Sequence, residues 1–102
     1  HRADKDQTTA LQPLLDKYGV DLVIWGDNHN YERIKFPNKH TVFIQSGTGG
    51  ESHYEFEGQI NESIYQNDKD FGFTKILVSP SSLMGQFISH SGKILDNFSV
   101  IK

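Results

Sequence analysis

The amino-terminal part of the chain has apolar residues at the spacing of one face of an α-helix. They are Leu11, Leu14, Leu15 and Tyr18. Because Pro13 lacks a backbone N–H group, we expect the regular helix to begin close to it, and we expect Gly19 to end it. The apolar run at residues 20–25 is rich in β-branched residues, so it predicts a buried strand on which this helix packs.

The middle of the chain alternates between polar and apolar segments. A loop and a polar break at residues 37–39 separate the first strand from a second one, predicted at 41–45. Residues 46–50 form a glycine-rich loop, and glycine allows the backbone to approach a site closely. Residues 51–70 are polar and have no clear period, which predicts a long loop with a turn of helix at 60–65. This loop is a candidate lid.

The last third of the chain has three strand-like runs, at residues 73–79, 84–90 and 93–101. Ser-Gly at residues 91–92 joins the last two in the manner of a hairpin, so we expect antiparallel strands. No repeat, low-complexity tract or internal boundary is visible, which indicates that residues 1–102 form one unit. The predicted fold class is α+β, with one amino-terminal helix packed on a mixed, largely antiparallel sheet.

Residue types that bind metals follow the first strand directly. Gly26 permits a sharp exit that brings Asp27 and His29 to the carboxyl end of the strand, where open α/β sheets bind ligands. If the backbone stays extended, the Asp27 and His29 side chains lie on one side and those of Asn28 and Asn30 on the other. The alternative is that these residues only turn the chain, because Asn and Asp tolerate turn geometry and bond their own backbone.

Residues 26–33 read Gly-Asp-Asn-His-Asn-Tyr-Glu-Arg. This segment resembles the last ligand motif of the calcineurin-like metallophosphoesterases, especially the purple-acid-phosphatase branch, where a strand ends in Gly-His-x-His followed by a small or polar residue and Tyr-Glu-Arg. Similarity extends upstream through residues 11–21 and downstream through 42–50, 71–73 and 92–98. The resemblance implies that the chain is the carboxyl-terminal part of an α/β/β/α metallophosphoesterase sandwich.

The resemblance also implies metal ligands. In the family both histidines of the motif bind metal, one for each ion of a dinuclear centre, so His29 is implied as a ligand. Asp27 stands where the family has the first histidine, and as a substitute ligand it would favour harder cations such as Mn²⁺. His1 is a third candidate, because His1 and Arg2 resemble the end of an earlier ligand motif, although the spacing to Asp27 is shorter than in the family. The implied cofactors are two divalent or trivalent ions of Mn, Fe or Zn.

The substrate implied by the resemblance is a phosphate ester. Asn28 and Asn30 could hydrogen-bond its oxygens, with turn formation as the competing role of both, and Tyr31 would present its ring to the cleft. His53 lies just past the glycine-rich loop, where it could be a general acid or a substrate contact, with an exposed loop histidine as the alternative. No residue is assigned as catalytic in the chemical step.

Five other polar residues are expected to be structural or exposed. Glu32 and Arg33 are predicted to form an ion pair with each other, and the resemblance gives Asp96 a structural role. His40 and His90 flank strands and are expected at the surface. None of these five is a candidate for the chemistry.

Composition narrows the range of partners. A formal net charge of -3 gives no basic surface, which disfavours nucleic acid as the main partner. The absence of cysteine excludes disulfides and thiolate sites. No apolar stretch approaches the roughly 20 residues that a membrane span needs.

The resemblance therefore implies a hydrolase, a metal-dependent phosphoesterase whose dinuclear centre is completed by upstream residues. The family's bridging aspartate and Asn-His pair precede this segment, so we expect the isolated chain to be inactive. Two ions about 3.5–4 Å apart would clamp the ester and generate the attacking hydroxide. The alternative, motivated by Asp27 in place of histidine, is a catalytically inactive phosphoesterase-like domain that serves as a binding or scaffold module.

Overall fold

The computed structural model describes residues 5–26, 29–50 and 61–102, with side chains described from residue 10 onward. One helix, α1 (Lys5–Tyr18), begins this part of the chain. The strands are β1 (Leu22–Trp25), β2 (Tyr31–Lys35), β3 (Val42–Ser46), β4 (Ser63–Asn67), β5 (Gly72–Val78), β6 (Ser82–Ser89) and β7 (Ile94–Ile101). Among these residues, no helix has the length and apolar character needed to cross a membrane.

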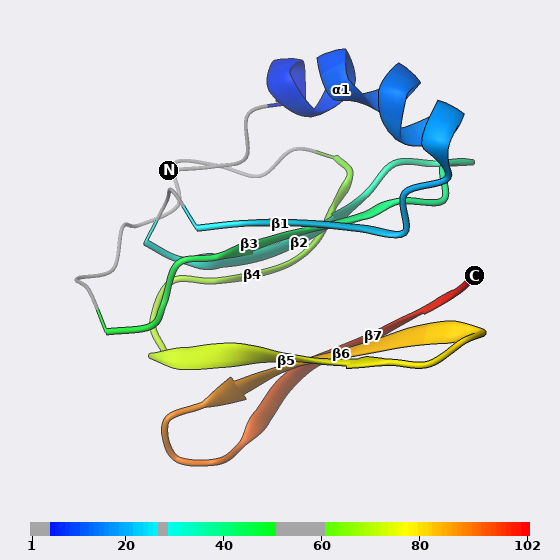
Figure 1. Ribbon diagram of the computed structural model, residues 1–102. Helices are drawn as coiled ribbons and strands as arrows, with labels where there is room; N and C mark the ends of the chain where they lie inside the picture. Colours follow the sequence, from blue (N-terminus) through cyan, green and yellow to red (C-terminus); the bar gives the residue numbers. More distant parts are fainter. Residues whose placement is uncertain (1–4, 27–28, 51–60) are drawn as a thin grey trace.

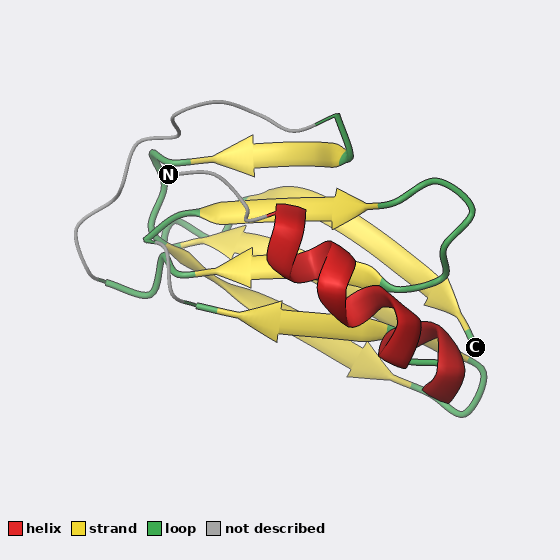
Figure 2. Ribbon diagram, turned by 90° about the horizontal axis from the view of Figure 1, so that it is seen from above, coloured by secondary structure: helices red, strands yellow, loops and turns green. Residues whose placement is uncertain are grey.

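The strands form two sheets that pack face to face, and α1 covers the outer face of the first sheet (Figures 1 and 2). The first sheet has the order β1-β3-β2-β4 and is mixed, because β1 and β3 are parallel whereas β2 is antiparallel to both of its neighbours. The second sheet, β5-β6-β7, is antiparallel throughout. This arrangement confirms the predicted α+β class.

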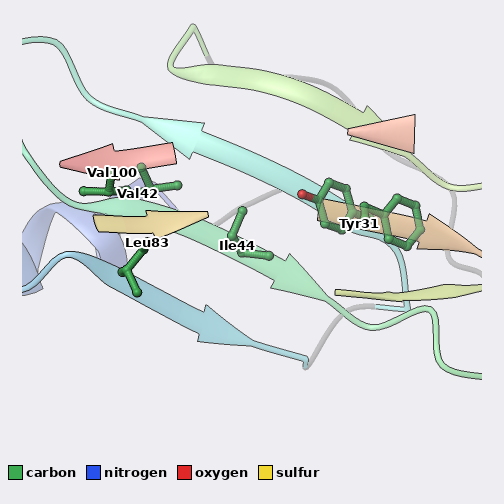
Figure 3. Close-up of a cluster of buried hydrophobic side chains, with 6 residues drawn as sticks. Tyr31, Val42, Ile44, Leu83 and Val100 are labelled. Carbon is green, nitrogen blue, oxygen red and sulfur yellow. The ribbon is translucent and has the colours of Figure 1, made fainter. Parts of the chain in front are cut away.

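The main core lies between the two sheets (Figure 3). Its buried members are Tyr31, Val42, Ile44, Leu83, Phe87 and Val100. The rings of Tyr31 and Phe87 stack across the interface with centroids 4.2 Å apart. A second cluster on the other face of the first sheet packs Leu15 of α1 against Ile34 and Phe43. Both faces of β2 and β3 are therefore buried.

The helix is longer than the sequence pattern indicated. It begins at Lys5, so the expectation that it starts near Pro13 is wrong. A proline removes one backbone donor, yet the helix continues through Pro13, and Leu15 in the following turn packs on the sheet. The predicted end at Gly19 is confirmed. Gly19 has φ 62°, and its N–H and that of Val20 bond back into the last turn in a Schellman motif.

β1, β3, β5, β6 and β7 follow the sequence pattern, whereas the pattern does not predict β2 and β4. The expectation of a loop before residues 37–39 is wrong at β2, where Glu32 and Arg33 are both held by specific partners inside the fold. β4 occupies much of the segment where a helical turn was expected at residues 60–65, so that expectation is wrong. Tyr65 favours a strand over a helical turn here. When β4 pairs with β2, the Tyr65 ring packs edge-on against the Tyr31 ring, with the ring centroids 5.9 Å apart. The three closing strands and the hairpin at Gly92 are confirmed.

Candidate functional site at the end of the first strand

The carboxyl ends of β1 and β3 meet the beginning of β2 at one edge of the first sheet. Gly26 leaves β1 so close to β3 that an added Cβ would lie 3.2 Å from the Ser46 carbonyl oxygen. His29 lies at this edge and is partly buried. A residue without a Cβ therefore suits position 26, and His29 lies at the ends of these strands.

Asn30 fixes the chain directly after His29. Its carbonyl oxygen accepts the N–H of Gly47 at 2.9 Å, and its side-chain Oδ1 accepts Nε2–H of Gln45 at 3.3 Å. Asn30 and Gln45 are each 1% exposed. No local pattern predicts this anchor, because an asparagine in such a segment is more typical of a turn.

Below the site, Asp96 of β7 binds two side chains of β2. It accepts a hydrogen bond from the Tyr31 hydroxyl at 2.8 Å and a two-pronged ion pair from Arg33 at 2.8 and 3.1 Å. Burial, reinforced by the Asp96 charge, raises the pKa of Tyr31 far above its ordinary value. The structural role expected of Asp96 is confirmed. The predicted pairing of Arg33 with Glu32 is wrong, since neighbouring residues of a strand point to opposite faces.

Glu32 lies on the helix side of the first sheet and is 1% exposed. Its Oε2 accepts hydrogen bonds from the Ser63 hydroxyl at 2.6 Å and from Gln66 Nε2 at 2.9 Å. Both donors come from β4, so this buried carboxylate is a reason for β4 to pair with β2. Such bonds offset the cost of removing a carboxylate from water.

The glycine-rich loop after β3 packs against the second sheet. Thr48 is 1% exposed, its carbonyl accepts the N–H of Gly72 at 3.0 Å, and its hydroxyl lies 3.5 Å from the Gly72 carbonyl. Ser46 and Thr74 join their hydroxyls at 2.8 Å. These contacts confirm the interpretation of the loop as close packing beside the site.

The structure describes some of the candidate site residues and not others. Asp27, Asn28, His1 and His53 lie outside the described residues, as does the first half of the candidate lid, residues 51–60. Tyr31 is fully buried with its hydroxyl on Asp96, so its predicted substrate contact would require a ligand to reach the inter-sheet core. His40 and His90 are exposed, as expected.

His29 supplies a nitrogen donor that suits Mn, Fe or Zn. In residues 5–26, 29–50 and 61–102, no group of three or more His, Cys, Asp or Glu side chains could hold a metal ion. The described residues therefore fit one position of a metal centre and do not form a centre by themselves.

No family model matches the chain. Probable inactive purple acid phosphatase 1 of Arabidopsis thaliana is 34% identical to it, over 91% of this chain and 18% of that protein. A nucleotide pyrophosphatase/phosphodiesterase of Hordeum vulgare is 30% identical, over 89% of the chain and 30% of that protein.

The fold is shared with solved structures. A purple acid phosphatase from seeds of yellow lupin (Lupinus luteus) superposes with a TM-score of 0.76 at 31% identity, over 89% of this chain and 19% of that one. The chain is similar to part of a purple acid phosphatase. GAP50, described as the anchor in the inner membrane complex of Plasmodium, gives a TM-score of 0.82 at 25% identity, over 98% of this chain and 31% of that one.

These findings confirm the resemblance to purple acid phosphatases that the motif at residues 26–33 indicated. The likeness extends over about nine-tenths of the chain. The chain spans less than a third of the length of each of these four proteins.

Proposed function

We propose that the chain is the carboxyl-terminal part of a metal-dependent phosphoesterase that hydrolyses phosphate esters. The observation that carries this proposal is the placement of His29 at the strand ends, in a fold shared with a purple acid phosphatase. The names of the relatives, a phosphatase and a nucleotide pyrophosphatase/phosphodiesterase, support phosphate esters as the substrate class.

In this proposal the residues of the chain bind and orient. His29 holds one ion of a dinuclear centre, Asp27 holds or steers the other, and His1 is a further candidate ligand. Asn28 and His53 contact the substrate. Bound metal ions of this kind supply Lewis acidity and a nucleophilic hydroxide at neutral pH. The remaining ligands are contributed by polypeptide outside the described residues.

The test uses a longer protein that contains this chain together with the polypeptide preceding it. His29→Ala should lower kcat/KM for an aryl phosphate by more than about 100-fold, because losing a ligand exceeds the 10–100-fold effect of losing a ligand's partner. Mn, Fe and Zn content should fall in parallel. His40→Ala is the matched control, since His40 is exposed at the opposite end of β3. Unchanged turnover in the His29 variant would contradict the metal assignment.

The second candidate function is a catalytically inactive phosphoesterase-like module that binds a partner or serves as a scaffold. It is favoured by Asp27 at the position of a family histidine and by the word "inactive" in the name of the Arabidopsis relative. The same longer protein decides between the two. A purified sample with no metal and no turnover after incubation with Mn²⁺, Fe²⁺ or Zn²⁺ would favour the module.

A further inference from the structure

The chain directly after His29 is held by β3. Asn30 is bonded to β3 and to the residue after it through both its side chain and its backbone. His29 immediately precedes this anchor in the sequence, and the peptide bond that joins the two residues is planar. A change in how Asn30 is held should therefore move His29.

The anchor at Asn30 is built from two buried amide side chains, whose burial costs more free energy than the burial of apolar side chains would. Asn30 and Gln45 are both 1% exposed, so each amide has given up water to form this bond. Gln45 is itself held in register, opposite Trp25 of β1 and Glu32 of β2. A polar bond between elements fixes one relative orientation, which an apolar contact does not, and this accounts for its presence next to His29.

We infer that Asn30 is a positioning residue for the His29 imidazole, acting through the bond from Gln45 and the adjacent backbone bond from Gly47. The inference rests on the proposed function only for what His29 binds. The orientation of the ring by Asn30 is a property of the chain alone.

The experiment records the ring C–H resonances of His29 by NMR in the 102-residue chain, assigned with a His29→Gln variant. Asn30→Leu keeps the branched shape of the side chain and removes the acceptor, so the His29 ring resonance should move at least halfway toward the value of a histidine in an unfolded peptide. Asn30→Asp keeps an acceptor for Gln45 and should restore the wild-type resonance. Gln45→Met removes the donor from the other side and should reproduce the effect of Asn30→Leu.

The matched control is Thr74→Val, which removes a hydrogen bond to the neighbouring residue of β3, Ser46, without touching Asn30. It should leave the His29 resonance unchanged. A folded Asn30→Leu or Gln45→Met variant with a wild-type His29 resonance would overturn the inference. So would a Thr74→Val variant that shifts the resonance equally, because the effect would then be general loosening.

A second measurement adds Mn²⁺ alone and follows the broadening of the histidine ring resonances. In the wild type, broadening of His29 at lower Mn²⁺ concentration than His40 or His90 is expected from the proposed function, and Asn30→Leu should raise the concentration needed by about tenfold. If wild-type His29 is not broadened first, the isolated chain has no preferred Mn²⁺ site at His29, the metal role is decided by the longer protein, and the ring resonances still decide the positioning role. If Asn30→Leu changes neither the resonance nor the Mn²⁺ response, the positioning role is wrong.

Discussion

At the scale of single residues, Asp96 holds the beginning of β2 against the second sheet. Its carboxylate accepts hydrogen bonds from both the Tyr31 hydroxyl and the Arg33 guanidinium, and its side chain is only 7% exposed. Asp96→Asn should lower the free energy of unfolding by about 3 kcal/mol, because it leaves Arg33 without its counter-ion in a largely buried place. Urea unfolding followed by circular dichroism measures this loss.

The control for that prediction is Asp16→Asn. Asp16 pairs with Lys39 at the surface, where hydrogen bonds from Lys39 and Gln12 lower the pKa of the carboxyl, and exposed pairs of this kind contribute little. Its urea midpoint should stay close to that of the wild type. Equal losses in the two variants would show that Asp96 is no more than a surface charge.

Tyr31 makes the stability of the chain sensitive to alkali. Its pKa in the folded state is raised by burial above its ordinary value near 10, so above about pH 10 the unfolded chain loses this proton while the folded chain keeps it. Stability should therefore fall with a slope of about 1.4 kcal/mol per pH unit from this residue alone. Tyr31→Phe should remove that part of the slope between pH 10 and 12, measured by thermal unfolding.

Tyr18→Phe is the matched control, because Tyr18 is 69% exposed and its hydroxyl is not buried by folding. Its pH profile should follow the wild type. An unaltered slope in Tyr31→Phe would mean that the buried hydroxyl does not couple to folding.

At the scale of elements, β6 and β7 depend on the pairing of a glycine with an aromatic ring. Gly85 lies opposite Phe98, and a Cβ at Gly85 would be 2.0 Å from the Phe98 ring. Gly85→Ala should cost about 2 kcal/mol, because the ring must leave its position over the glycine. In a Phe98→Leu background the additional cost should be smaller, and Gly49→Ala, which meets no atom within 4 Å, should be nearly neutral. Chemical unfolding of the four variants completes the test.

The elements also show what the sequence could and could not predict. The closing strands were predictable because their apolar residues are separated by polar turns and a Ser-Gly hairpin. β2 was not, since Glu32 and Arg33 look like loop residues until their partners on β4 and β7 are known. For the site, the local motif predicted where His29 lies. The anchor at Asn30 depends on the register between β2 and β3, which no local pattern encodes.

At the scale of the whole molecule, the described residues supply one candidate metal ligand and a fold shared with much longer proteins. The isolated 102-residue chain should therefore bind Mn²⁺ weakly and hydrolyse p-nitrophenyl phosphate no faster than buffer, because one or two ligands do not assemble a dinuclear centre. Isothermal titration and a colorimetric assay check the two expectations. Robust turnover that disappears in His29→Ala would show that the chain is self-sufficient.

The contact between Tyr31 and Asp96 joins residues 65 positions apart in the sequence. During synthesis on the ribosome, the segment with His29 and Tyr31 leaves the exit tunnel well before β7 has been translated. The Tyr31 hydroxyl and the Arg33 guanidinium gain their common acceptor only after Asp96 has been synthesised. The edge that carries His29 should thus be among the last parts of the nascent polypeptide to mature, and a stalled product ending before Asp96 should be open to proteases there.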